Sequence, residues 1–241
     1  MTQNFSTDED LSFLKDNLQE VLESIQNAAV KANRSPDSIR LMAVTKTVKP
    51  LYINYMLSNG IGLIGENKVQ ELLSKVEFFN KPVPEMHIIG HLQSNKVRKI
   101  IDTVDMIQSV DSISLAKEIS RQAALHEKSM DILLEVNIGS EEAKTGLDIR
   151  DINETAFAVS EMEGINLKGL MCVPPISDSE SETRGYFEKT RRLYDELSSA
   201  LKGKCEFSVL SMGMSGDYVH AIAEGSNLVR VGSALFGARR Y

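Results

Sequence analysis

The sequence predicts a single (β/α)8 barrel of the TIM type, with one extra helix in front of it. Short apolar runs alternate with stretches of helical hydrophobic spacing, and eight such runs follow one another along the chain. The length of 241 residues fits this fold, since such barrels often reach about 250 residues as one unit. We therefore expect one domain over residues 1–241, with a flexible segment at 1–10. A doubly wound open sheet is the competing fold, but no GxGxxG fingerprint of a dinucleotide site follows the first run.

The extra helix comes first along the chain. Leucine, valine and isoleucine recur at helical spacing over residues 8–33, and Ser6 or Thr7 is the candidate cap of this helix. The expected strands lie at 39–45, 61–64, 86–89, 105–108, 131–137, 167–172, 207–210 and 228–231. The expected helices between them lie near 50–58, 66–79, 93–101, 112–127, 149–161, 180–202 and 216–224, and a final short helix begins near Ala234.

Composition is that of an ordinary globular protein, with 42% hydrophobic and 25% charged residues. The formal net charge of −7 at pH 7 argues against a nucleic-acid backbone as the main partner. Cys172 and Cys205 belong to no CxxC pair and no Cys/His cluster, so we expect neither a disulfide framework nor a metal site.

The N-terminal segment predicts no export. Residues 1–10 are polar and acidic and lack the charged start and apolar centre of a signal peptide. No apolar stretch of the sequence reaches the roughly 20 residues that a membrane-spanning helix needs. We expect a cytoplasmic protein with no membrane partner.

Lys46 closes the first apolar run, which begins at Ile39, and Pro50 follows it in a predicted loop. In a barrel the active site lies at the carboxyl ends of the strands, where this lysine is placed. Loss of water disfavours the charged form of an amine, and the neutral amine is a nucleophile that forms Schiff bases. The alternative is a solvated lysine at the end of a strand.

Two segments at the ends of the last two predicted strands are typical of a phosphate site. They offer hydroxyl groups and unobstructed backbone amides at Ser211, Gly213, Ser215, Gly216, Gly232 and Ser233. Barrels often bind phosphate after strands seven and eight. The alternative is that these residues are turn glycines and helix caps.

Arg230 lies between Val229 and Val231 in the last apolar run, so its side chain is expected on the opposite face from theirs. If the valines pack outward against helices, Arg230 points into the barrel, where a guanidinium needs a partner. A structural salt bridge is one answer, and the ring nitrogen of a bound heterocycle is the other. An aldehyde that carries a phosphate and a pyridine nitrogen fits the lysine, the phosphate segments and the arginine together, and pyridoxal 5'-phosphate (PLP) is such a compound.

The chain resembles the YggS/PROSC family of pyridoxal phosphate homeostasis proteins, which are similar to the N-terminal barrel domain of alanine racemase. The resemblance runs from about residue 11 to the end and implies a fold-type III PLP barrel. The matching stretches are 43–46, 65–67, 70–71, 87–96, 109–112, 136–138, 144–146, 169–171, 210–217 and 229–237.

This resemblance implies roles for individual residues. Lys46 matches the lysine that holds PLP covalently as a Schiff base, and Arg230 matches the arginine that faces the pyridine nitrogen. Asn67 matches a residue beside the cofactor. The phosphate contacts match Ser211, Gly232 and Ser233, with Met212 and Ser215 nearby. The resemblance also includes a family motif at His91, Gln93, Asn95 and Lys96, and the sequence does not indicate the role of this motif.

Lys144, in the loop with Gly146, is a candidate second and transient acceptor of PLP. The alternative is a solvated loop lysine, and we favour this alternative. Loss of PLP from a Lys46→Ala/Lys144→Ala double variant, but not from Lys46→Ala alone, would support the second acceptor.

Two functions of different class fit the same residues. A PLP-dependent amino-acid racemase needs an acid and a base on opposite faces of the substrate carbon, and in alanine racemase the second group is a tyrosine from a further β-domain. This chain ends at Tyr241, directly after the last barrel helix, so we expect no such domain. We favour a PLP-binding protein of intracellular PLP homeostasis, which buffers or delivers the cofactor without robust catalysis. An unrelated barrel enzyme that acts on phosphosugars is a third alternative.

The resemblance and the composition together set the expected partners. PLP is the expected ligand, and apo forms of PLP-dependent enzymes are the candidate recipients. We expect a monomer, because the dimer contact of the racemase depends on the further domain.

Overall fold

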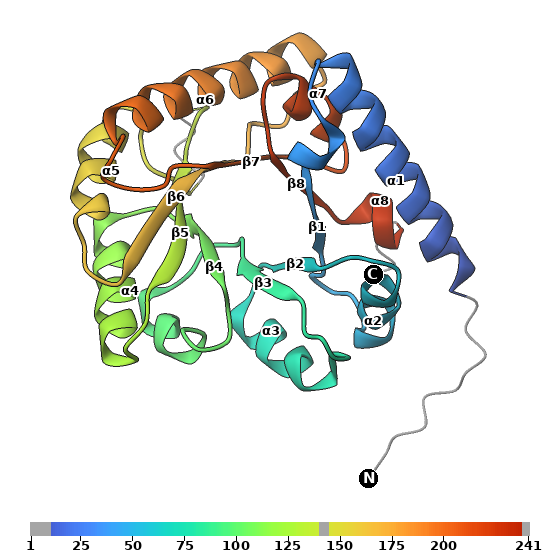
Figure 1. The fold of residues 1–241 in the computed structure, drawn as a ribbon, viewed down its shortest axis with the longest axis horizontal. Coiled ribbons are helices and arrows are strands. Elements are labelled where there is room, and N and C mark those ends of the chain that lie inside the picture. The colour runs from blue at the N-terminus through green and yellow to red at the C-terminus, as the bar shows by residue number, and fades with distance from the viewer. Residues whose placement is uncertain (1–10, 140–144, 238–241) are drawn as a thin grey trace.

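The computed structural model describes residues 11–139 and 145–237. At its centre, parallel strands pair in chain order from β1 to β8, and β8 pairs with β1 to close a barrel (Figure 1). The strands are β1 (Arg40–Val44), β2 (Leu63–Glu66), β3 (Glu85–Ile88), β4 (Met106–Val110), β5 (Met130–Val136), β6 (Ile165–Cys172), β7 (Val209–Met214) and β8 (Leu228–Val231). The prediction of a TIM-type (β/α)8 barrel is confirmed.

Helices surround the barrel on its outside (Figure 1). They are α1 (Ser12–Lys31), α2 (Pro50–Ser58), α3 (Val69–Lys75), α4 (Ile113–Leu125), α5 (Ile152–Ser160), α6 (Glu180–Ala200), α7 (Tyr218–Ala223) and α8 (Ser233–Phe236). Short 3-10 helices are η1 (Pro36–Ser38), η2 (Val76–Phe78) and η3 (Ser94–Lys99).

Two expected helices differ from the structure. The stretch at 93–101 forms the 3-10 helix η3, in which Lys96 N–H bonds to Gln93 O, three residues back. The stretch at 66–79 is divided into α3 and η2, and it starts later than expected because Glu66 stays in β2. The candidate caps Ser6 and Thr7 lie outside the described residues, and the described helix α1 begins at Ser12.

Strands β2 and β7 lie further along the chain than their expected positions of 61–64 and 207–210. Polar or small residues interrupt the apolar run in each strand, Gly65 and Glu66 in β2 and Ser211 and Gly213 in β7, so a search for apolar runs ends too early. Backbone pairing continues nevertheless, since Glu66 pairs with Ile88 and Met214 pairs with Arg230.

The extra helix α1 covers one side of the barrel, against α7 and α8 (Figure 1). Its apolar face is buried at Leu14, Leu18, Val21, Ile25, Ala28 and Ala29. Asn17 donates to Leu235 O at 3.0 Å, and Arg34 donates to Ser226 O at 2.6 Å. These bonds tie α1 and the turn that follows it to the segments after and before β8.

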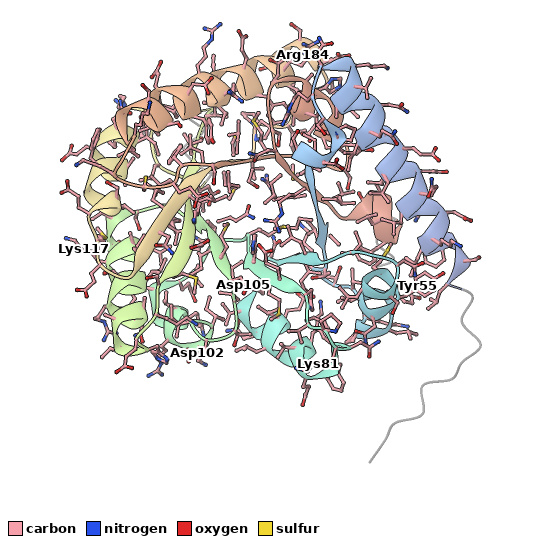
Figure 2. All side chains as sticks on the ribbon, viewed as in Figure 1. Tyr55, Lys81, Asp102, Asp105, Lys117 and Arg184 are labelled. Carbon is pink, nitrogen blue, oxygen red and sulfur yellow. The ribbon has the colours of Figure 1, made fainter. Side chains whose placement is uncertain are left out.

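The apolar residues form one outer core and two small inner clusters. The outer core joins strands to helices and includes Val229 and Val231. The inner clusters are built on Met42, Leu63 and Leu228, and on Met106, Leu133 and Met171. All six come from strands, as alternation along a strand requires of residues that face the barrel interior. Figure 2 shows side chains filling the space inside the ring of strands.

Candidate cofactor-binding site

Lys46 lies in a turn directly after β1, and the residue is half-buried. The backbone on either side of it is bonded to a cluster of charged side chains from β2 and α3. Lys75 donates to Thr45 O at 2.8 Å, and Glu71 accepts a hydrogen bond from Thr47 N–H. The turn that presents Lys46 is therefore fixed on both sides by α3.

The cluster beside this turn is a buried ion pair with an additional carboxylate. Lys75 Nζ lies 2.7 Å from Glu66 Oε1 and 2.6 Å from Glu71 Oε1. Burial raises the pKa of Glu66 against the opposing effect of Lys75. Burial also acts to raise the pKa of Glu71, but the hydrogen bonds from Lys75 and Thr47 outweigh it and lower that pKa. Within the described residues, Glu66 Oε2 is buried without a hydrogen-bond partner.

Arg230 points into the barrel, as the sequence predicted, while the two valines beside it pack in the outer core. Arg230 is buried, with 3% of its surface exposed. The guanidinium donates to Ser211 Oγ at 2.7 Å and to Cys172 O at 2.8 Å. Burial lowers the pKa of Arg230, yet an arginine keeps its proton at neutral pH. The inner end of the site thus holds a fixed positive charge.

The Ser211 hydroxyl has two hydrogen-bond partners inside the barrel. It accepts from Arg230 and donates to Gln108 Oε1 at 2.7 Å. A serine hydroxyl has one hydrogen to donate, and Ser211 donates it in the bond to Gln108. The phosphate contact of Ser211 stays a prediction, and this side chain supports Arg230 in the structure.

A cluster of polar groups follows β7 and β8. Ser215 Oγ accepts hydrogen bonds from Gly232 N–H at 3.1 Å and from Ala234 N–H at 3.3 Å. Two amides and a hydroxyl therefore converge at one point, which is the arrangement that anion sites use. Ser233 is exposed beside them. The side chain of Met212 lies in the outer core with Ala221 and Ile222, so only its backbone is on the side of this cluster.

Pairing between β1 and β8 brings the lysine turn to this polar cluster. Ala43 pairs with Val231, and a Cβ atom on Gly232 would lie 3.4 Å from Val44. On the other side of the turn, Thr45 N–H bonds to Gly65 O at 3.0 Å. Asn67 follows β2 and packs so closely on Gly90 that a Cβ there would lie 2.6 Å from Asn67 O. The predicted residues thus gather at the carboxyl ends of neighbouring strands.

These residues fit the chemistry of PLP. The aldehyde of such a compound needs an amine, its phosphate needs N–H and O–H donors, and its pyridine nitrogen needs a donor. The amine is that of Lys46, and the phosphate donors are those of the Ser215–Gly232–Ala234 cluster. The donor for the pyridine nitrogen is Arg230.

Sequence reasoning missed several polar residues that face the barrel interior. Gln108 and His87 are buried and bonded to each other at 2.8 Å. Glu135 is buried near Arg230, and its pKa is raised by burial. His87 and Glu135 each lie between apolar neighbours in a strand, which is the signal that pointed to Arg230, whereas Gln108 is followed by Ser109 and lacks this signal.

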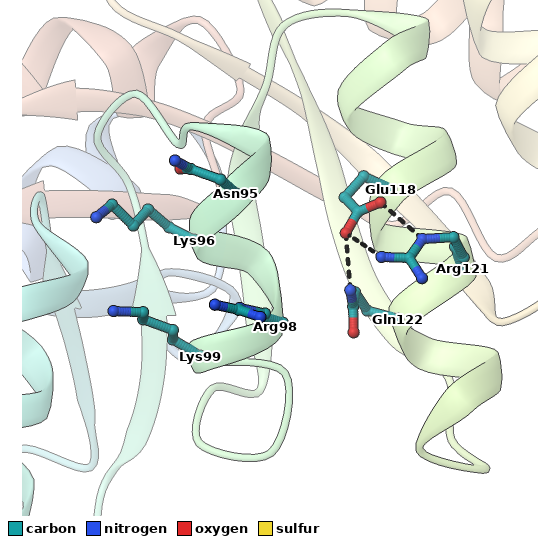
Figure 3. A pocket seen from close by; sticks show the side chains of 7 residues that line it. All are labelled: Asn95, Lys96, Arg98, Lys99, Glu118, Arg121 and Gln122. Atoms are coloured by element: carbon teal, nitrogen blue, oxygen red, sulfur yellow. Dashed lines mark hydrogen bonds and ion pairs between the residues drawn. The ribbon is translucent and has the colours of Figure 1, made fainter.

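The motif of His91, Gln93, Asn95 and Lys96 follows β3. His91 Nδ1 lies 2.9 Å from Asp111 Oδ2, near the carboxyl end of β4. Asn95 and Lys96 instead line a cleft between η3 and α4, together with Arg98, Lys99, Glu118, Arg121 and Gln122. Figure 3 shows the side chains of η3 on one side of this cleft, and on the other side Glu118, which bonds both Arg121 and Gln122. The motif therefore divides between two places.

Three further predictions concern absences or segments outside the structure. Lys144 lies outside the described residues. In the part of the chain that the structure describes, no group of three or more His, Cys, Asp or Glu side chains is arranged to hold a metal ion. Within residues 11–139 and 145–237, no helix has both the length and the apolar character needed to cross a membrane.

Residues 10–240 match the family model of the alanine racemase N-terminal domain. A pyridoxal phosphate homeostasis protein of Aquifex aeolicus is 40% identical over 228 residues, which cover 93% of this chain and 97% of that protein. The chain belongs to the pyridoxal phosphate homeostasis protein family. This confirms the resemblance found in the sequence.

Solved structures agree with this family. PipY of Synechococcus elongatus, determined with PLP bound, is 33% identical to this chain at a TM-score of 0.78. The match covers 89% of this chain and all of that one. An alanine racemase of Clostridium difficile shares the fold at a TM-score of 0.72 and 16% identity, and the match covers 94% of this chain and 58% of the racemase.

Proposed function

We propose that this chain is a PLP-binding protein of intracellular PLP homeostasis, which holds the cofactor as a Schiff base on Lys46 and buffers or delivers it without robust catalysis. The observation that carries the proposal is the convergence of a lysine turn, an amide and hydroxyl cluster and a buried arginine at the carboxyl ends of β1, β7 and β8. Membership of the family and the PLP bound to PipY support it.

Each group of the chain has one task in this proposal. The Lys46 amine condenses with the aldehyde and releases water, and the imine that results is reversible. The amides of Gly232 and Ala234 and the hydroxyl groups of Ser215 and Ser233 bind the phosphate. When bound, PLP supplies an aldehyde carbon that exchanges between amines, which suits storage and transfer to apo enzymes.

Other predicted contacts complete the site. Asn67 lies beside the cofactor at the end of β2. Met212, through its backbone, and Ser211 are proposed contacts near the phosphate, and the Ser211 hydroxyl also accepts a hydrogen bond from Arg230.

Arg230 favours a carrier over an amino-acid racemase. Carbanion chemistry on PLP is strongest when the pyridine nitrogen is protonated, because the ring then withdraws electrons. A guanidinium donates a hydrogen bond to that nitrogen and keeps its own proton. The ring is then a weak electron sink, and slow chemistry at the substrate carbon follows.

The test is the visible absorption of the purified protein with added PLP, before and after borohydride. We expect a yellow band that borohydride removes in the wild-type protein, and its loss or alteration in Lys46→Ala. Lys49→Ala is the matched control, because Lys49 is an exposed lysine only three residues after Lys46, at the start of α2. We expect the Lys49→Ala variant to keep the band. A protein that stays colourless with PLP would contradict the proposal and indicate a site for another phosphate compound.

A further inference from the structure

A continuous series of hydrogen bonds runs through the inside of the barrel, starting at Arg230. Its guanidinium donates to Ser211 Oγ at 2.7 Å, and Ser211 Oγ donates to Gln108 Oε1 at 2.7 Å. The amide nitrogen of Gln108 lies 2.8 Å from His87 Nδ1. His87 Nε2 lies 2.8 Å from Glu85 Oε1. We call these five residues the inner polar row.

The inner polar row crosses the barrel from one end to the other. Arg230, Ser211, Gln108 and His87 are buried, whereas the Glu85 side chain is 35% exposed. Glu85 is the first residue of β3, so it lies at the end of the barrel opposite the candidate site. There its second oxygen pairs with an arginine whose side chain is 48% exposed, Arg40, at 2.6 Å.

The bonds of the row all point in one direction. An arginine can only donate, so Ser211 Oγ accepts a hydrogen bond from Arg230 and donates one to Gln108. A carboxylate can only accept, so His87 donates from Nε2 to Glu85 and accepts at Nδ1 from the Gln108 amide. Every donor therefore faces away from Arg230 and toward Glu85. A change at Glu85 alters the bond of His87, and through it the bond of each following member.

We infer that the inner polar row positions Arg230 and couples the cofactor site to the opposite end of the barrel. The inference rests on the proposed function, because Arg230 acts there on the pyridine nitrogen of PLP. Glu85, His87 and Gln108 are positioning residues: they hold the guanidinium in one orientation through the Ser211 hydroxyl and do not touch the cofactor. The Arg40–Glu85 pair is the outer end of the row, where solvent and other molecules reach it.

Two variants test the row at different depths. Gln108→Met removes the central bonds with little change in side-chain length. Glu85→Gln removes the charge at the half-exposed end, where a substitution leaves the core intact. Asp131→Asn is the matched control, because Asp131 also lies at the start of a barrel strand, where Asn166 donates to it outside the row.

The first measurement is nitrogen NMR of the protein without PLP. We expect His87 to carry its proton on Nε2 in the wild type. Glu85→Gln should change the His87 signals and also the guanidinium signals of Arg230, whereas Asp131→Asn should change neither. Unchanged Arg230 signals in both row variants would overturn the coupling, and this result does not depend on whether PLP binds.

The second measurement is the release of PLP to an excess of a carbonyl reagent, followed by absorbance. We expect release at least about fivefold faster in Gln108→Met, a smaller increase in Glu85→Gln, and a wild-type rate in Asp131→Asn. Wild-type rates in both row variants would contradict the inference while leaving the proposed function intact. A wild-type protein that binds no PLP would instead contradict the proposed function, and the NMR measurement would still decide the coupling.

Discussion

Two serines of one sequence motif show how the fold assigns different tasks to identical residues. Ser211 is inside β7, where its hydroxyl joins Arg230 to Gln108. Ser215 lies just beyond the strand, where its oxygen meets the amides of Gly232 and Ala234. We therefore propose the side-chain contact to phosphate for Ser215, because the single hydroxyl hydrogen of Ser211 is donated to the buried Gln108.

Ser215→Ala tests the phosphate contact. A hydrogen bond to a charged group contributes about 1.5–3 kcal/mol, so we expect PLP to bind about tenfold to 100-fold more weakly. Pyridoxal, which lacks the phosphate, should bind equally to both proteins. Titration by absorbance measures both affinities. The control is Ser120→Ala on α4, whose hydroxyl bonds to Glu163 O, and an equal loss for PLP and pyridoxal in Ser215→Ala would contradict the assignment.

Glu85 predicts a pH dependence of stability. The hydrogen bond from His87 and the pair with Arg40 lower the pKa of Glu85 from 4.5 to about 2, against the effect of burial. A lowered pKa in the folded state stabilises the protein above the unfolded value, and this contribution is lost as the pH falls from about 4.5 to about 2.

Urea unfolding of the wild type and Glu85→Gln at several pH values measures this contribution. We expect the difference in unfolding free energy to be largest at neutral pH and to shrink below about pH 4.5. Glu20→Gln on the exposed side of α1 is the control. A difference that does not change with pH would show that Glu85 acts by packing rather than by charge.

At the scale of elements, the β1–α2 turn depends on α3. Lys75 reaches from the end of α3 to the carbonyl of Thr45 and to two carboxylates. Because the helix and the turn share these bonds, the position of Lys46 is decided by a helix that begins more than twenty residues later in the chain.

Lys75→Met tests the link between α3 and the turn. Removing one partner of a buried pair leaves the Glu66 charge uncompensated, so we expect a loss of about 3–5 kcal/mol in unfolding free energy. Adding Glu66→Gln should recover part of this loss, since the charge is then absent. Lys68→Met is the control at an exposed position of the same segment. Urea unfolding measures all three, and equal stability of Lys75→Met and Lys68→Met would contradict the role of the pair.

At the scale of the whole molecule, the barrel brings together groups from both ends of the chain. Lys46 follows the first strand and Arg230 lies in the last, and closure of the barrel pairs these two strands with each other. The barrel interior then joins Arg230 to β3 and β4 through the inner polar row. The molecule thus carries a buried arginine at the inner end of the candidate site.

Exchange of the α-hydrogen of alanine distinguishes a carrier from a racemase. In heavy water with PLP bound, we expect exchange far below the common enzyme range of about 1–1000 per second, because Arg230 leaves the pyridine nitrogen unprotonated. Proton NMR of alanine measures it, with free PLP at the same concentration as the control. Turnover within the enzyme range would contradict the carrier and favour the alternative.

The sequence by itself determined the barrel, the place of Lys46 after its first strand and the inward side chain of Arg230. Apolar runs at regular intervals reveal parallel strands that are buried on both faces, and a polar residue inside such a run marks the interior. Only the tertiary structure decided which partner each polar group has. The contacts of Lys75 with Thr45, and of Gln108 with His87 and Ser211, join residues distant in sequence. No local pattern specifies such pairs, because closure of the barrel creates them.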